Sequence, residues 1–162
     1  MRMRSFLIAV FGLLLKRKNV FALASCLFLH CPFSQAQKQV IFTEKAPKPI
    51  GPYSQAISNG NTLYISGQIA LRTDGSLDTS SIENETTLVL TNLKAILDAA
   101  KMEMKHVLKC TIYVTDLKNF KRINDVYATF FASDPPARET VEVRALPKGA
   151  HIEISAIAKG KQ

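Results

Sequence analysis

The chain has 162 residues, of which 47% are apolar and 21% are charged, an ordinary globular composition whose length favours one domain. The formal net charge of +8 is unevenly spread, because the first 36 residues contain five basic residues and no acidic one. The remaining 16 Lys and Arg residues nearly balance the 13 Asp and Glu residues, which argues against a nucleic-acid-binding protein, since such proteins normally carry a basic stripe.

Residues 1–36 have the features of a signal or targeting segment. Two apolar runs, Phe6–Leu15 and Val20–Phe33, are separated by Lys16-Arg17-Lys18, and neither is long enough to span a bilayer comfortably. The second run ends at Ser34-Gln35-Ala36, with small residues where a signal peptidase cleaves. We therefore expect residues 37–162 to form a mature domain, secreted or periplasmic after cleavage. Three alternatives are an uncleaved membrane anchor, an organelle presequence and a mis-assigned start codon, which would leave a cytoplasmic protein.

The first part of the mature domain reads as strands and turns. Gln39–Thr43 is a short apolar run typical of a strand, and Ala46–Tyr53 contains three prolines and a glycine, which predicts a loop with a restricted backbone. Thr62–Ser66 and Gln68–Leu71 are predicted strand segments on either side of Gly67.

A helix and a strand follow. Ser80 and Glu83 have the spacing of a capping box, and apolar residues recur behind them at helical spacing, which predicts a helix from Ser81 to Ala100. Lys101 occupies the stop position, where glycine would be easier. Leu108–Val114 alternates apolar and polar residues, the pattern of a half-buried strand.

The last part contains a second helix and two more strands. Asp116 can cap a helix whose apolar stripe ends before Asp134-Pro135-Pro136. The strands Arg138–Leu146 and His151–Ala158 are joined by Pro147-Lys148-Gly149, a turn sequence that predicts a hairpin. With two amphipathic helices, the economical arrangement is an α+β domain in which both helices pack on one face of a mixed sheet.

Cysteine and histidine do not indicate a metal site. Cys110 is the single cysteine of the mature domain, so it has no internal disulfide partner, and its place on the apolar side of a strand predicts a buried, inert thiol. His106 and His151 are isolated, with no second ligand at metal-binding spacing, so no metal ion is expected.

The last two strands direct attention to Arg138. If Val141 and its apolar neighbours pack against the helices, Arg138 and Thr140 lie with Glu153 on the opposite, semi-polar face, on neighbouring strands. Such a face can be solvated, or can pack on another subunit and leave a cleft. Arg138 follows a stiff Pro135-Pro136 entry and can therefore present its planar guanidinium to a carboxylate.

Several short motifs resemble the Rid family, also called RidA/YjgF, the reactive intermediate (2-iminobutanoate/2-iminopropanoate) deaminases. They are Gly51-Pro52-Tyr53-Ser54-Gln55-Ala56, Ser66-Gly67-Gln68-Ile69, Pro136-Ala137-Arg138, Val141-Glu142-Val143, Leu146-Pro147-Lys148, Ile152-Glu153-Ile154 and Ala156-Ile157-Ala158. Each is weak alone, but together they follow the family's order from Val40 to Lys159. The resemblance implies a chorismate-mutase-like fold that assembles as a homotrimer, with active sites in the clefts between subunits.

The resemblance also implies roles for individual residues. Arg138 matches the arginine that binds the substrate carboxylate, and Glu153 matches the glutamate that positions or activates water. Thr140 stands where many deaminases of the family have cysteine, so its backbone groups rather than a thiol would hold the imine or the water. The family's substrate-binding positions are held here by Tyr53, Ser66, Gly67, Asn124, Arg138 and Thr140.

The implied activity is hydrolysis of small 2-imino or enamine acids to 2-keto acids and ammonium, without a metal or organic cofactor. One alternative is a non-catalytic member that binds a carboxylate metabolite through the same Arg138. A weaker alternative is an RNA-cleaving translation inhibitor, which the small net charge of residues 37–162 disfavours.

Overall fold

The computed structural model of the chain describes residues 37–160. The targeting segment expected in residues 1–36 lies outside this range, so its cleavage and the compartment of the protein stay predictions. No helix within the described range is long and apolar enough to cross a membrane.

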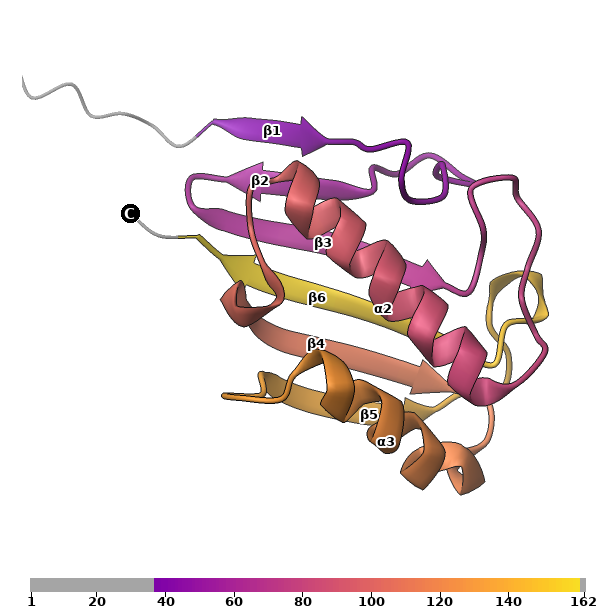
Figure 1. Ribbon diagram of the computed structural model, residues 1–162. Helices are drawn as coiled ribbons and strands as arrows, with labels where there is room; N and C mark the ends of the chain where they lie inside the picture. Colours follow the sequence, from indigo (N-terminus) through magenta and orange to yellow (C-terminus); the bar gives the residue numbers. More distant parts are fainter. Residues whose placement is uncertain (1–36, 161–162) are drawn as a thin grey trace, which may run out of the picture. The chain divides into compact units, whose positions relative to one another are not determined.

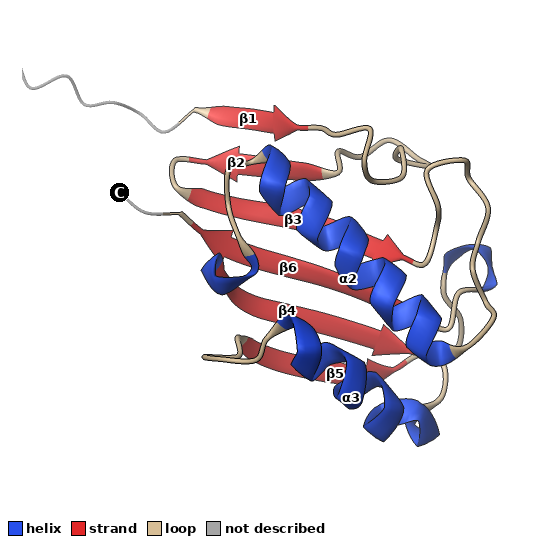
Figure 2. Ribbon diagram, in the orientation of Figure 1, coloured by secondary structure: helices blue, strands red, loops and turns tan. Residues whose placement is uncertain are grey.

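Six strands form one mixed sheet with the order β1-β2-β3-β6-β4-β5, and two helices cover one of its faces (Figures 1 and 2). The pairing of β4 with β5 is parallel, and every other pairing in the sheet is antiparallel. This confirms the predicted α+β class with both helices on one face. The strands are β1 (Lys38–Ile41), β2 (Ala56–Asn59), β3 (Thr62–Ile69), β4 (Val107–Val114), β5 (Ala137–Glu142) and β6 (Ile152–Lys159), and the helices are α2 (Ile82–Ala99) and α3 (Phe120–Phe130).

Helix α2 begins one residue later than the predicted capping box implies. Ser81 is the N-cap, and its hydroxyl accepts a hydrogen bond from the backbone N–H of Asn84. The Ser80 hydroxyl instead donates to Asp78 Oδ1 at 2.6 Å, so Ser80 belongs to the preceding turn. At the other end, Lys101 adopts a positive φ of 58°, the left-handed conformation expected at a helix stop.

The core lies between the helices and the central strands. The apolar side of β6 is buried as predicted, and Cys110 of β4 is buried as well. The largest fully buried apolar side chains come from the central strands and from both helices, namely Leu63, Val89, Leu90, Leu93, Ile96, Leu97, Ile112, Val114, Ile123, Ile152 and Ile154.

The predicted hairpin between the last two strands is wrong, because β4 lies between β5 and β6. Helix α3 separates β4 from β5 and returns the chain to the end where β4 began, so β5 runs parallel to β4. Strand β5 ends at Glu142 rather than Leu146, and residues 143–151 connect it to β6 past the end of β4. Pro147-Lys148-Gly149 forms a 3-10 turn in which Lys148 and Gly149 have positive φ values.

The predicted orientation of β5 is wrong too. Arg138 and Thr140 are in register with Cys110 and Ile112, which are buried beneath the helices, so their side chains take the helix side of the sheet. Glu153 is in register with Tyr113 and projects from the open side. Alternation along a strand defines two faces but does not say which one is covered, and β5 is an edge strand whose apolar Val141 is 45% exposed.

Candidate functional site

A hollow of about 270 Å³ lies where β3 ends and β6 begins, at the end of the sheet that also carries the 143–151 connection. It brings together four of the residues singled out in the sequence: Tyr53, Ser66, Gly67 and Glu153. Apolar side chains complete its wall, and we call it the glutamate hollow. Its full lining is Ile50, Tyr53, Ser66, Gly67, Ile69, Pro147 and Glu153.

Gly67 is required by the position of Glu153. The pairing of β3 with β6 shifts register between Ile65 and Gln68, and Gly67 lies within this irregularity. A Cβ atom at Gly67 would overlap Glu153 Oε1 and come within 2.7 Å of its carboxyl carbon. The glycine therefore lets the carboxylate lie directly against the strand backbone, as in other places where a group approaches the main chain closely.

Burial raises the pKa of the Glu153 carboxyl above its ordinary value. Glu153 is partly buried, and no cation of residues 37–160 forms an ion pair with it to counter this effect. A carboxyl whose pKa lies closer to neutrality exchanges protons more readily at physiological pH. This suits Glu153 for proton transfer in the hollow.

Tyr53 is carried by a loop that one buried amide holds together. The Gln55 side chain accepts from the Thr43 N–H at 2.7 Å and donates to the carbonyl groups of Thr43, Ala46 and Pro47. The Tyr53 hydroxyl in turn accepts from the backbone N–H of Ile50 at 3.2 Å. The sequence alone does not mark Gln55 as a residue of this kind, although it stands in the motif Gly51-Pro52-Tyr53-Ser54-Gln55-Ala56. The proline content of the loop could have indicated this role. Prolines limit regular backbone pairing, so a side chain must form hydrogen bonds with the backbone groups of the loop that remain unpaired.

Ser66 links this loop to β3. Its hydroxyl donates to the Ser54 carbonyl at 2.7 Å, and its backbone N–H donates to the Gln55 carbonyl at 3.0 Å. Ser66 thus fixes the loop against the strand at the rim of the glutamate hollow.

The other three predicted residues lie together on the helix side of β5, in a group that we call the arginine patch. The Arg138 guanidinium carbon is 4.8 Å from the ring centre of Tyr127 and 5.6 Å from that of Phe120, both on α3. Asn124 lies between these rings in the sequence of α3, and Thr140 follows Arg138 on the same side of β5. The arginine patch comprises Phe120, Asn124, Tyr127, Arg138 and Thr140.

Three polar groups of the arginine patch lack a counterpart. Within the described range, Arg138 forms no ion pair, and Asn124 Oδ1 and the Tyr127 hydroxyl are buried without a hydrogen-bond partner. Burial raises the pKa values of Tyr127 and of the neighbouring Cys110 thiol, which keeps both groups neutral. The patch therefore offers an uncompensated positive charge and an unused amide oxygen, which suits an anionic ligand with a hydrogen-bond donor.

The glutamate hollow and the arginine patch are on opposite sides of the same sheet. The prediction that Arg138, Thr140 and Glu153 share one face of neighbouring strands is wrong, because β4 lies between their strands and their registers point to different faces. A single copy of the chain cannot place Arg138 and Glu153 around one small molecule. A site that contains both requires a second copy.

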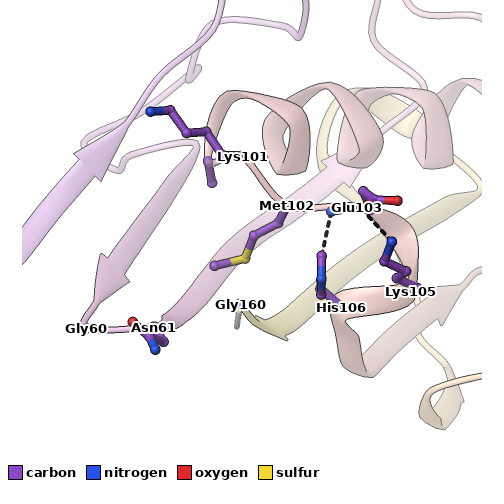
Figure 3. A pocket seen from close by; sticks show the side chains of 9 residues that line it. Gly60, Asn61, Lys101, Met102, Glu103, Lys105, His106 and Gly160 are labelled. Carbon is purple, nitrogen blue, oxygen red and sulfur yellow. Dashed lines mark hydrogen bonds and ion pairs between the residues drawn. The ribbon is translucent and has the colours of Figure 1, made fainter. Parts of the chain in front are cut away.

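A second hollow, of about 420 Å³, lies at the opposite end of β6 (Figure 3). Its polar groups are largely engaged with one another: Lys105 pairs with the Glu103 carboxylate at 2.6 Å, and His106 Nδ1 accepts from the Glu103 N–H at 2.9 Å. The Met102 side chain extends toward Gly160 and occupies part of the space. No residue predicted to bind substrate lines this hollow.

Residues 37–160 contain no group of three or more His, Cys, Asp and Glu side chains placed to share a metal ion.

A family model and individual protein sequences match the described part of the chain. The model of a family described as endoribonuclease L-PSP matches residues 43–159. A RutC family protein of Pyrococcus horikoshii is 52% identical over 122 residues, which cover 75% of this chain and 97% of that protein. A protein of Dermatophagoides farinae named 2-iminobutanoate/2-iminopropanoate deaminase is 45% identical over 121 residues, covering 74% of this chain and 94% of that protein.

Solved structures agree with the sequence relatives. The crystal structure of E. coli TdcF with bound serine is 37% identical and has a TM-score of 0.73, covering 76% of this chain and 99% of that one. A Yersinia pestis protein of the Rid family, YyfA, is 47% identical with a TM-score of 0.74, covering 76% and 100% of the two chains.

Proposed function

The chain belongs to the Rid (YjgF/endoribonuclease L-PSP) family, and on that premise we propose that it is a hydrolytic deaminase of small 2-imino and enamine acids. The substrates would be 2-iminobutanoate and 2-iminopropanoate, and the products the corresponding 2-keto acids and ammonium. The observation that carries the proposal is Glu153, which is packed against Gly67 in the glutamate hollow and whose pKa burial raises. Relatives that carry the deaminase name at 43–45% identity support it.

We further propose that the complete site forms between copies of the chain in a homotrimer, with the glutamate hollow of one copy facing the arginine patch of the next. The placement of Arg138 and Glu153 on opposite sides of the sheet supports this arrangement. The open sheet side also carries apolar side chains that no helix covers, including Val40, Tyr64 and Val141, which are 63%, 50% and 45% exposed. Burying such a surface against another copy is favourable.

In the proposed reaction, Arg138 binds the substrate carboxylate. The guanidinium lies over the rings of Phe120 and Tyr127, which restrict its plane and leave its edge for two parallel hydrogen bonds to a carboxylate. Holding the carboxylate fixes the adjacent imine carbon, so the entropy of bringing substrate and water together is lost on binding rather than in the reaction.

Glu153 of the facing copy transfers the protons. Its carboxylate takes a proton from water as the water oxygen bonds to the carbon of the protonated imine. The same carboxyl then returns that proton to the nitrogen. The C–N bond breaks as the C=O bond forms, while the Glu153 carboxylate takes the remaining hydroxyl proton and passes it to the departing ammonia. One iminium acid and one water thus become one 2-keto acid and one ammonium ion. Backbone groups near Gly67 of one copy and Thr140 of the other would hold the nitrogen and the water.

The test is turnover by the purified full chain of imines generated in place by a serine or threonine dehydratase. We expect keto-acid release to accelerate with the wild-type chain, and Arg138→Ala to lose nearly all of this acceleration. Arg138→Lys keeps the charge but not the planar fork, so we expect about a tenfold to hundredfold loss of kcat/KM. Lys118→Ala, which removes an exposed cation near the start of α3, is the control. Full activity in Arg138→Ala would refute the site.

A second candidate is a non-catalytic protein that binds a carboxylate metabolite through the arginine patch. The E. coli TdcF structure, which carries serine, favours this alternative, because serine has a carboxylate but no imine. Saturable, Arg138-dependent binding of serine without any turnover of 2-iminopropanoate would support it over the deaminase.

A further inference from the structure

Glu85 is a buried carboxylate that neither the glutamate hollow nor the arginine patch contains. It lies in the first turn of α2 and is 1% exposed. Its two oxygens contact one residue: Oε2 accepts from the His151 N–H at 3.0 Å, and Oε1 lies 2.6 Å from His151 Nδ1. A carboxylate buried this deeply is costly unless it is fully partnered, so His151 is held closely.

His151 is the last residue of the connection between β5 and β6. Its carbonyl group accepts from the Thr115 N–H at 3.1 Å, so its N–H is attached to α2 and its C=O to the end of β4. Just before it, Ala150 is buried in a small apolar cluster with Ile69 and Leu71. Glu85 therefore attaches the helix layer to the end of this connection.

The same connection forms one wall of the glutamate hollow through Pro147. The hydrogen bonds of its turn are local, from Gly149 N–H to the Leu146 carbonyl at 3.2 Å and from Ala150 N–H to the Pro147 carbonyl at 3.1 Å, and Leu146 packs on the same apolar cluster as Ala150. Lys148 and Gly149 both have positive φ values, a conformation that surrounding contacts must maintain for a non-glycine residue. Glu85 of α2 supplies such a contact from the helix layer, by binding His151 two residues after Gly149.

We propose that Glu85 is a positioning residue, which acts through His151 to hold the Pro147 turn against the glutamate hollow and so keeps Glu153 shielded from water. Glu85 does not touch the hollow itself. The inference rests on the proposed function, in which the glutamate hollow is part of the catalytic site. The shielding of Glu153 from water can nevertheless be measured without substrate.

Glu83 supplies a matched control. It also lies in the first turn of α2 and also bonds to another element, pairing with Arg122 of α3 at 2.6 Å, but its side chain is 41% exposed and does not contact the connection. The experiment compares full chains with Glu85→Leu and Glu83→Leu. The titration of Glu153 is followed by NMR of labelled side-chain carboxyls, with Glu153→Gln identifying its signal.

We expect Glu85→Leu to lower the pKa of Glu153 toward its ordinary value, because water reaches a loosened hollow, and Glu83→Leu to leave it unchanged. In the deaminase assay we expect kcat to fall about tenfold in Glu85→Leu with a smaller change in KM, since misplacing groups near the reacting atoms slows the chemical step. A folded Glu85→Leu chain in which Glu153 titrates as in the wild type would show a purely structural role and overturn the proposal.

If Glu85→Leu does not fold, His151→Ala tests the positioning role of Glu85 instead. The His151 ring is half exposed, so its removal disturbs the core less than removal of Glu85. A smaller shift of the Glu153 titration in the same direction supports the proposal, and an unshifted titration overturns it. Because this readout needs no substrate, a chain without deaminase activity can still confirm the role of Glu85, and an active one can refute it.

Discussion

The structure leaves no room for a side chain at Gly67. Its neighbour across the strand pair is the Glu153 carboxylate, which occupies the space that a side chain would need. We expect Gly67→Ala to displace Glu153, lowering kcat/KM about a hundredfold and the free energy of unfolding by about 1–3 kcal/mol.

Gly160→Ala is the control for this substitution. A Cβ at Gly160 would meet the flexible end of Met102 at 3.1 Å and the Asn61 carbonyl at an ordinary 3.9 Å, and Gly160 does not line the glutamate hollow. Activity and urea-unfolding measurements on both variants check the prediction. Equal activity in the two alanine variants would contradict the assignment of Gly67.

The raised pKa of Glu153 predicts how the activity depends on pH. Its pKa is raised by burial in the folded chain, and the proposed mechanism needs the ionised form. The acid limb of kcat/KM should therefore lie above the ordinary glutamate pKa, and activity should fall as the pH drops through the raised value. Initial rates across the acid range measure this limb, and a limb at or below the ordinary pKa would contradict it.

The same shift predicts an effect on stability. The folded chain binds the Glu153 proton more tightly than the unfolded chain, so the stability of the wild type should decline as the pH rises through this window. Glu153→Gln cannot ionise and should not show this decline. Chemical unfolding of both chains at several pH values separates Glu153 from the other titrating groups.

At the scale of elements, the loop before β2 depends on Gln55. Four hydrogen bonds from this buried side chain replace the pairing that the prolines of the loop cannot provide. We expect Gln55→Leu to leave these backbone groups unsatisfied, to lower the free energy of unfolding by about 1–3 kcal/mol and to raise KM by loosening Tyr53. Gln39→Leu on the exposed β1 is the control, and thermal unfolding with steady-state kinetics is the measurement.

The element scale also shows where sequence reasoning failed. The α2 helix, the alternation of β4 and the buried face of β6 were predicted because helical and strand periodicities are local. The hairpin was predicted from a turn sequence, Pro147-Lys148-Gly149, that also suits the end of a longer connection. The β4-α3-β5 unit, which makes β5 a parallel edge strand, outweighed this local signal.

Because Arg138 and Glu153 lie on opposite sides of the sheet, the proposed assembly of the whole molecule can be tested by mixing two inactive variants. In the proposed trimer, each site takes its glutamate hollow and its arginine patch from different copies. Arg138→Ala and Glu153→Gln chains, each inactive alone, should regain activity when unfolded together and refolded as a mixture. Random assembly would restore about one quarter of the sites.

The control mixes Arg138→Ala with Arg138→Lys, which cannot form an intact site. Sedimentation tests whether the mixtures form trimers, and the dehydratase-coupled assay measures the recovery of activity. A mixture that stays inactive although it contains both chains would show that the two groups do not act together across an interface.

The fold class, nearly all of the helices and strands and the candidate site residues can be predicted from the sequence alone. Helical and alternating patterns are local properties, and the quoted motifs name Tyr53, Gly67, Arg138 and Glu153 directly. The strand order, and the side of the sheet on which each of these residues lies, become known from the three-dimensional fold.

The physical reason is that strand order is set by contacts between segments far apart in the sequence. The register of β5 against β4 places Arg138 over the rings of α3, and the irregularity of β3 admits Glu153 on the opposite side. Neither arrangement can be predicted from the residues next to Arg138 or Glu153, because the alternation of apolar and polar residues defines two faces of a strand without showing which one is covered.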